Sequence, residues 1–211
     1  MDTERHDREK KFWDKYAPKY DPLIIRLKRT YNALLGRIGR YLDPSESVLE
    51  IATGTGVVAL AIAPKVRLVR ACDISGEMIR IARDKLRASG LDNVEFDVQD
   101  AYHLNYESES FDLAIASNVL HVMFDPRQAL SSVRGMLKPG GLLIAPTYCH
   151  GDSLKARMVS SLMSLSGFKA HQKWSVVSYR SFMESNGFEL VEYTVVPDII
   201  PLAFSVVRKT G

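Results

Sequence analysis

Closely spaced glycines and nearby acids in the first half of the chain could together bind a ligand. Residues 47–56 read SVLEIATGTG, in which an apolar run stops at Gly54 and Gly56 before a helix-like apolar rhythm resumes at Val57. This pattern predicts a strand, a tight turn and a helix. Glycine permits the backbone angles of such a turn and the close approach of a ligand, and the helix that follows presents unpaired N–H groups. We expect a nucleoside-type ligand.

The spacing of the glycines fits two ligand classes. Gly54-x-Gly56-x-x-Ala59 satisfies the dinucleotide fingerprint, and Asp73 lies near the position of a ribose-binding acid. Glu50, however, lies inside the buried strand, where a carboxylate is costly without a partner. A pyrophosphate would repel it and an ammonium would attract it. Because S-adenosylmethionine carries an ammonium, a sulfonium and no phosphate, it is the favoured ligand, and NAD is the alternative.

Three further residues are candidates for catalysis because each follows a predicted strand whose carboxyl end faces the ligand. They are His121, Tyr148 and His150. If the ligand is S-adenosylmethionine, in-line transfer of its methyl group would rely largely on positioning, and a base would be needed only by an acceptor such as a hydroxyl or an acidic carbon. His121 lies in a packed VLHVM run, so the alternative is that it only orders its loop.

Length and composition indicate one α/β domain. The chain has 211 residues, of which 46% are hydrophobic, and no apolar run approaches membrane-spanning length. The first residues are too charged for a secretion signal, so we expect a cytoplasmic protein. Cys72 and Cys149 have neither a CxxC partner nor a histidine at metal-ligand spacing. We therefore expect packed thiols and no metal.

The basic excess of the chain belongs to its N-terminal helices. Residues 1–40 hold eleven Lys and Arg against six Asp and Glu, within a net charge of +3 for the whole chain. Thr3 to Tyr20 reads as one helix, and Asp21-Pro22 is typical of the start of a second that runs to Leu42. Its basic face is either solvated or a contact for a membrane surface or lipid headgroup. No Arg-rich tract is present, so we do not expect nucleic acid as a partner.

Alternating strands and helices fill the middle of the chain. Strands are predicted at 68–72, 94–99, 111–117 and 142–147, and helices at 76–89 and 126–137, the latter ended by Lys138-Pro139-Gly140-Gly141. This alternation predicts a doubly wound parallel sheet that binds ligands at the carboxyl ends of its strands.

The last third departs from this alternation. Helices are predicted at 153–165 and 178–186, followed by strands at 188–196 and 202–208 whose short link allows only antiparallel pairing. We therefore expect a seven-stranded Rossmann-like α/β sheet, mostly parallel, with an antiparallel C-terminal hairpin. Within one domain (1–211), residues 1–42 would form a helical cap, 43–147 the cofactor-binding core, 148–177 a substrate lid, and 178–211 the last helix and strands.

The chain resembles the class I S-adenosylmethionine-dependent methyltransferases, in the branch that includes ubiquinone, menaquinone and phospholipid methyltransferases. The resemblance covers about residues 12–208. It rests on the ordered motifs VLEIATGTG, ACDIS, VQDA, FDLAIASNVLHVMFDP and LKPGGLLI. Ala52-Thr53 departs from the Gly-Cys or Gly-Ser that is common in the family, which implies a slightly less open loop.

The resemblance implies a role for each matched residue. Glu50 would meet the ammonium of the cofactor, Asp73 the ribose hydroxyls and Asp100 the adenine amino group; the alternative for the two aspartates is a plain strand-end cap. The other implied cofactor contacts are Ala52, Thr53, Gly54, Gly56, Ile74, Ala101, Ser117, Tyr16 and Tyr20. For the two tyrosines, core packing is the alternative. S-Adenosylhomocysteine would be the product.

The predicted lid indicates the class of acceptor. Residues 150–177 supply many apolar side chains, which favours a hydrophobic or amphiphilic acceptor, with a polar metabolite as the alternative. Ser117-Asn118-Val119-Leu120 lacks the Pro-Pro-aromatic signature of nucleic-acid amino methyltransferases. A NAD-dependent oxidoreductase and a non-catalytic cofactor-binding protein are the other functions considered, and a monomer or homodimer is expected.

Overall fold

The computed structural model describes residues 3–164 and 170–210, so Leu165 and Phe168 of the predicted lid lie outside the described residues. Contacts divide the chain into two compact units, Met1–Asn105 and Tyr106–Gly211. The single domain and its internal boundaries stay a prediction.

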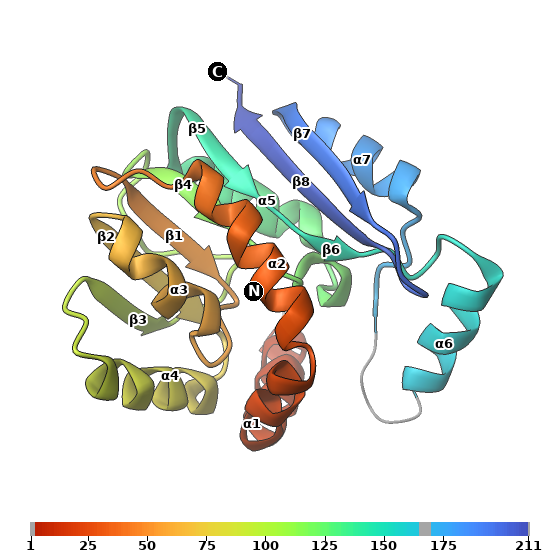
Figure 1. The fold of residues 1–211 in the computed structure, drawn as a ribbon, viewed down its shortest axis with the longest axis horizontal. Helices are drawn as coiled ribbons and strands as arrows, with labels where there is room; N and C mark the ends of the chain where they lie inside the picture. The colour runs from red at the N-terminus through yellow and green to blue at the C-terminus, as the bar shows by residue number, and fades with distance from the viewer. Residues whose placement is uncertain (1–2, 165–169, 211) are drawn as a thin grey trace. The chain divides into compact units, whose positions relative to one another are not determined.

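The elements of the first unit are α1 (Thr3–Arg26), α2 (Lys28–Ile38), η1 (Gly39–Tyr41), β1 (Ser47–Ile51), α3 (Val57–Ile62), η2 (Ala63–Lys65), β2 (Leu68–Asp73), α4 (Gly76–Ser89) and β3 (Val94–Val98) (Figure 1).

The strands of the first unit form a parallel ladder. Ser47 to Ile51 of β1 pair with Leu68 to Cys72 of β2, and Val69 to Asp73 of β2 pair with Val94 to Val98 of β3. All five residues of β1 are buried, as expected of a strand that is covered on both faces. Because the strands run in one direction, the loops that follow them open at one edge of the ladder. The predicted strand–turn–helix at 47–62 is confirmed.

Helix α4 shows how local sequence fixes the start and end of an element in this unit. The Ser75 hydroxyl accepts a hydrogen bond from the Met78 amide at 3.1 Å, and Gly90 ends the helix with φ +73°. Its buried Met78, Ile79 and Ala82 face the strands. The helix predicted at 76–89 is confirmed.

The predicted boundary between the first two helices is wrong. Helix α1 continues through Pro18 and Pro22 to Arg26, and the break falls at Leu27. Asp21 does not cap a new helix, because its carboxylate accepts hydrogen bonds from the Thr55 hydroxyl at 2.6 Å and from Lys85 at 2.7 Å. These long-range contacts hold α1 in place beyond Tyr20, although each proline removes one helical hydrogen bond.

The second unit combines parallel and antiparallel strands. Its elements are β4 (Phe111–Ile115), η3 (Leu120–Val122), α5 (Pro126–Met136), β5 (Leu137–Ile144), β6 (Thr147–Tyr148), α6 (Leu154–Ser164), α7 (Val176–Glu184), β7 (Phe188–Val196) and β8 (Leu202–Lys209). β4 and β5 are parallel, whereas β8 runs antiparallel to β5, to β6 and along its whole length to β7. The predicted C-terminal hairpin is confirmed.

The expected start of the fifth strand is wrong. Lys138-Pro139-Gly140-Gly141 lies inside β5, which begins at Leu137 directly after α5 and ends at Ile144. Leu137 pairs with Phe111, and a register shift follows before Leu113 pairs with Leu142. Gly140, with φ +74°, lies within the irregular stretch. Thr147 belongs to the short strand β6, because Pro146 has no N–H to continue the ladder.

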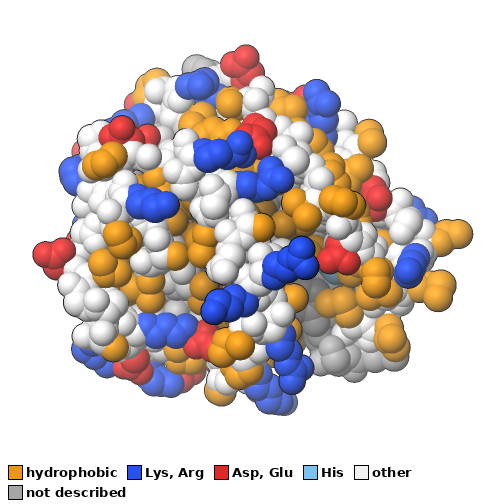
Figure 2. All heavy atoms as spheres, in the orientation of Figure 1, with side chains coloured by type: hydrophobic (Ala, Val, Ile, Leu, Met, Phe, Trp, Pro, Cys, Tyr) orange, Lys and Arg blue, Asp and Glu red, His pale blue; other side chains and the backbone are white. Residues whose placement is uncertain are grey.

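Helix α6 presents its bulky residues to solvent. Leu154, Met158 and Leu162 are 79%, 72% and 69% exposed, whereas the small residues Ala156 and Ser160 are buried. Figure 1 shows α6 standing beyond the ends of the strands of its unit, and Figure 2 shows hydrophobic side chains gathered over it. In the described part of the chain, no helix is long and apolar enough to cross a membrane.

Cys72 and Cys149 are buried and form no disulfide, so the prediction of packed thiols is confirmed. Burial raises the pKa of the Cys149 thiol to about 12 and raises that of Cys72 further. Both thiols are therefore protonated and unreactive at neutral pH. Among residues 3–164 and 170–210, no group of three or more His, Cys, Asp or Glu side chains could hold a metal ion.

Replacing Gly56 with Ala should destabilise the protein. The residue has φ +77°, and an added Cβ would lie 2.6 Å from Cζ of Phe96 and 3.1 Å from the Ala82 methyl. We expect a loss of about 1–3 kcal/mol, seen as a fall in Tm of roughly 2–4 °C per kcal/mol.

The matched control is Gly36→Ala in α2. A Cβ there meets nothing within 4 Å, and removing a helix glycine should stabilise by roughly 0.5–1 kcal/mol. Equal changes in Tm for the two variants would contradict the packing described for Gly56.

Candidate functional site

Glu50 is a buried acid at the end of β1. Its side chain is 2% exposed, and the Thr53 hydroxyl donates a 2.6 Å hydrogen bond to its Oε2. Burial raises the pKa of the Glu50 carboxyl to about 8, although the Thr53 hydrogen bond acts in the opposite direction. Near neutral pH the carboxyl is therefore mostly protonated. A cation placed beside it would favour the carboxylate.

Asp73, at the end of β2, joins two loops. Its Oδ2 accepts a 2.8 Å hydrogen bond from the Gly54 amide, and its Oδ1 accepts one of 2.9 Å from the Ser75 amide. Burial raises the pKa of this carboxyl to about 6. Because each carboxylate oxygen can accept two hydrogen bonds, Asp73 can accept further donors beside these backbone amides. A vicinal diol presents two donors suited to that arrangement.

Asp100 follows β3 and is also buried. Its Oδ1 accepts a 3.0 Å hydrogen bond from the Tyr102 amide, and its Oδ2 lies 3.1 Å from Nη2 of Arg5 and 3.2 Å from Nδ1 of His6. His6 is only partly exposed and contacts this acid. Ala101, one of the implied cofactor contacts, is 8% exposed.

The two glycines of the loop differ in what they face. A Cβ on Gly54 would lie 3.3 Å from the Tyr20 ring, so this glycine allows the ring to approach the backbone. Gly56 faces Phe96 and α4, so its role is packing inside the unit. Ala52 has a positive φ of 50°, which is uncommon for a residue with a side chain. Ala52, which departs from the glycine that is common in the family, therefore lies at a strained backbone position.

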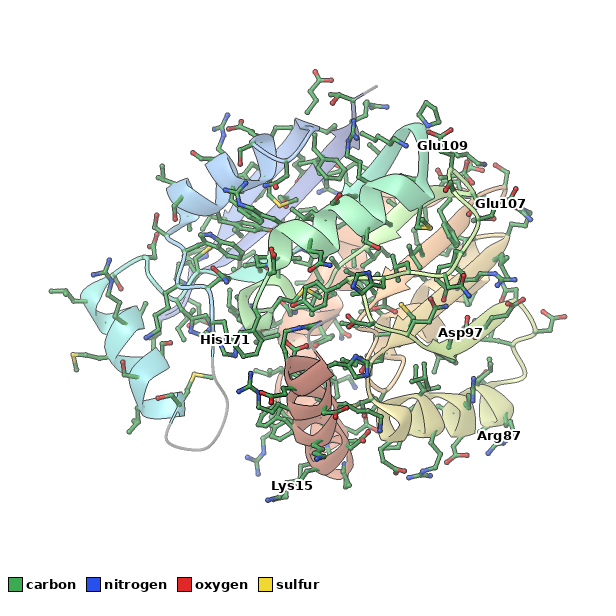
Figure 3. All side chains as sticks on the ribbon, turned by 180° about the vertical axis from the view of Figure 1, so that it is seen from behind. Lys15, Arg87, Asp97, Glu107, Glu109 and His171 are labelled. Atoms are coloured by element: carbon green, nitrogen blue, oxygen red, sulfur yellow. The ribbon has the colours of Figure 1, made fainter. Side chains whose placement is uncertain are left out.

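Helix α1 covers the loops that follow β1, β2 and β3. Tyr20 lies over Gly54, and the Asp14 carboxylate accepts hydrogen bonds from the Ser75 hydroxyl at 2.6 Å and the Glu77 amide at 3.2 Å. Figures 1 and 3 both show α1 beside the start of α4. Tyr16 instead stacks on Phe12, with ring centroids 5.9 Å apart.

Sequence reasoning missed the contacts of α1 with these loops. They join residues 34 to 95 positions apart, such as Thr55 with Asp21 and Arg5 with Asp100. No local pattern marks such partners.

The second unit brings the three predicted catalytic residues together. The rings of His121 and His150 stack with centroids 5.1 Å apart, and the Tyr148 ring meets His121 edge-on at 6.0 Å. Both histidines are 2% exposed. Burial lowers the pKa of His121 to about 3 and that of His150 to about 4. Both imidazoles are therefore neutral at physiological pH.

The remaining predicted cofactor residues lie at strand ends. Ile74 is half-buried between Asp73 and Ser75 at the start of α4. Ser117 follows β4, and in the described part of the chain its buried Oγ has no hydrogen-bond partner. Such an atom is costly to bury alone, so a polar ligand group would relieve it.

Glu50 should make the stability of the protein depend on pH. Because its pKa is raised from 4.5 to about 8 on folding, the folded state holds a proton that the unfolded state has lost between these values. Stability therefore falls as pH rises through this window. In Glu50→Gln this contribution is absent, so Tm should rise above that of the parent by several degrees at pH 8 and converge with it near pH 5.

Thermal unfolding between pH 5 and 8.5 checks this expectation, with the exposed Glu107→Gln as control. The titration of Asp73 contributes equally to the Tm of every variant, so it cancels when their curves are compared. Parallel curves for the parent and Glu50→Gln would show that Glu50 is not buried as an acid.

Comparisons with known proteins agree with this architecture. Residues 42–187 match a family described as a methyltransferase domain. Methyltransferase GfsG of Streptomyces halstedii is 30% identical over 203 residues, which cover 90% of this chain and 71% of GfsG. The ubiquinone/menaquinone biosynthesis C-methyltransferase UbiE of Geotalea daltonii is 30% identical over 151 residues, covering 67% of this chain and 63% of UbiE. The chain thus spans less than two thirds of that relative.

A solved structure shows the same fold. The N-methyltransferase NodS of Bradyrhizobium japonicum, in complex with S-adenosylhomocysteine, superposes with a TM-score of 0.66 at 17% identity, covering 87% of each chain. The Rossmann-like fold and the resemblance noted from the motifs are confirmed. The family match, the GfsG similarity and the strand-end acids together show that this chain belongs to the class I S-adenosylmethionine-dependent methyltransferases.

Proposed function

We propose that this chain transfers the methyl group of S-adenosylmethionine to a small amphiphilic acceptor. The observation that carries the proposal is the placement of three buried acids, Glu50, Asp73 and Asp100, at the carboxyl ends of three adjacent parallel strands. The cofactor offers an ammonium, a ribose diol and an adenine amino group, which is one donor for each acid. A nicotinamide dinucleotide offers a pyrophosphate and no ammonium for Glu50, so an oxidoreductase is less well supported.

Within this proposal, β1 and its loop hold the methionine part of the cofactor. Glu50 would release its proton to solvent on binding the ammonium, and the Thr53 hydroxyl would keep the carboxylate oriented. Asp73 accepts from both ribose hydroxyls while its own backbone hydrogen bonds keep it in place. Gly54 allows a close approach to the backbone, Ala52 and Thr53 line the loop beside it, and Gly56 supports the loop from behind.

The adenine end is assigned to the loops after β2 and β3. Asp100 accepts from the amino group, the backbone of Ala101 reads a ring nitrogen, and Ile74 packs on the adenine face. Tyr20, which already lies over Gly54, covers the cofactor. Tyr16 has its ring against Phe12, and it would need to move to take part.

The second unit is assigned to the acceptor. When bound, S-adenosylmethionine supplies an electrophilic methyl group on its sulfonium, to be attacked in line by an acceptor lone pair. Ser117 would lie on the sulfonium side of this reaction. The neutral imidazoles of His121 and His150 accept and donate hydrogen bonds and, with Tyr148, orient the acceptor. Their low pKa values make them weak proton acceptors, so an acceptor that is already a good nucleophile suits this cluster best.

Helix α6 supports an amphiphilic acceptor. It exposes Leu154, Met158 and Leu162 along one face, and its only charged residues, Lys155 and Arg157, are basic. Apolar side chains exposed in a row are typical of surfaces that bind an apolar group. Together they suit a molecule with an apolar body and a polar or anionic end.

The junction of α1 and α2 supports contact with a lipid surface. Leu23 and Ile25 are 37% and 71% exposed, and Arg26, Lys28 and Arg29 lie exposed beside them in the sequence. This combination of basic and apolar side chains suits the headgroup region of an anionic membrane.

We place the protein in the cytoplasm, which the two free, buried thiols support.

Methyl transfer can be tested by incubating the protein with labelled S-adenosylmethionine and a host extract, then separating organic, aqueous and macromolecular fractions. We expect label in the organic fraction. Label confined to the aqueous fraction would replace the amphiphilic acceptor with a polar one. Tight cofactor binding without label in any fraction would contradict the enzyme activity.

Asp73→Asn should weaken binding of S-adenosylhomocysteine. The amide keeps the size of the side chain but loses one charged acceptor, so we expect a loss of about 10- to 100-fold in affinity by calorimetry. The control is Asp92→Asn, at an exposed position before β3. Unchanged affinity in Asp73→Asn would refute the ribose assignment.

His150→Gln and His121→Gln should slow methyl transfer by about tenfold or more and leave the affinity for S-adenosylhomocysteine within about twofold. Because the imidazoles titrate near pH 4 and below, the rate should show no histidine-dependent change between pH 6 and 8. The exposed His103→Gln is the control. Normal transfer rates in both cluster variants would remove the histidines from the reaction.

A further inference from the structure

The first turns of α1 occupy the acid that the adenine would need. Arg5 and His6 both contact Oδ2 of Asp100, and the Tyr102 amide donates to Oδ1. The ion pair is largely buried, with 12% of the Arg5 side chain and 7% of the Asp100 side chain exposed. In water-poor surroundings such a pair is strongly coupled, and removing one partner leaves the other without compensation.

Arg5 is held at this position by more than Asp100. Its Nη1 lies 2.7 Å from Glu9 Oε2, one helical turn along α1, and its guanidinium stacks 4.0 Å above the Tyr102 ring. The two carboxylates therefore share one guanidinium. The contact of Arg5 with Asp100 depends on how strongly Glu9 competes for it.

The rest of α1 is anchored independently of Arg5. Asp14 holds the start of α4 through Ser75 and Glu77, and Asp21 holds the glycine loop through Thr55. The first turns can therefore separate from Asp100 while the remainder of the helix stays in place.

We propose that Arg5 sets the affinity of this protein for its cofactor, because the Arg5–Asp100 contact competes with the adenine amino group for Oδ2. Binding then requires the first turns of α1 to release Asp100, and product release is assisted when Arg5 returns. The proposal rests on the proposed function, since it takes Asp100 as the adenine acid.

The test is calorimetric titration of S-adenosylhomocysteine into four proteins. Arg5→Ala removes the guanidinium from Oδ2 and leaves His6 in place, and the dissociation constant should fall by about three- to tenfold. Glu9→Gln removes the second carboxylate that pairs with the Arg5 guanidinium. The Arg5–Asp100 contact is then stronger, so the dissociation constant should rise. Lys15→Ala removes a positive charge from the exposed face of α1, where Figure 3 shows Lys15 pointing away from the unit, and it should bind like the parent.

Hydrogen exchange of residues 3–12 in the ligand-free proteins provides a readout that is independent of binding. Exchange should be faster in Arg5→Ala than in the parent and Lys15→Ala. Weaker or unchanged binding in Arg5→Ala, with the parent binding normally, would overturn the competition and indicate that Arg5 supports the cofactor. A parent protein that binds no S-adenosylhomocysteine would instead contradict the proposed function.

Discussion

The carboxylate of Asp73 is the interaction on which the first unit depends. It accepts one hydrogen bond from the loop after β1, through Gly54, and one from the start of α4, through Ser75. Two segments that are separated in sequence are thereby fixed on a single side chain. Burial raises its pKa to about 6, so at neutral pH the acid is mainly charged and remains a strong acceptor.

The neighbouring acids are likewise held by hydrogen bonds and ion pairs, some of which come from α1. Glu50, Asp73 and Asp100 are each buried, and each has partners among hydroxyl, amide or basic groups of the first unit. Burying three acids at one edge of a sheet is unfavourable unless donors or cations compensate them. Helix α1 supplies Arg5 and His6 for Asp100, whereas burial raises the pKa of Glu50 to about 8, and a cation bound beside it would lower that pKa.

The local features of this structure were predictable from sequence, and the long-range ones were not. The SVLEIATGTG segment, the Ser75 cap and the short link before Leu202 each encode their structure within a few residues, so the strand–turn–helix, α4 and the hairpin were predicted correctly. The continuation of α1 past Pro22 depends on Asp21 meeting Thr55 and Lys85, partners that no local pattern reveals. Likewise, His121 and His150 were predicted only as separate candidates at strand ends, and their stacking was not predicted.

The most direct test of the cofactor assignment is the number of protons released when S-adenosylhomocysteine binds, measured by calorimetry at pH 6.5 in buffers of different ionisation enthalpy. At this pH the ligand's amino group is already protonated and Glu50, with a pKa of about 8, is mostly neutral. If the ammonium binds beside Glu50, the parent should release about one proton more than Glu50→Gln. Equal proton release by the two proteins, with binding intact, would show that Glu50 does not receive the ammonium.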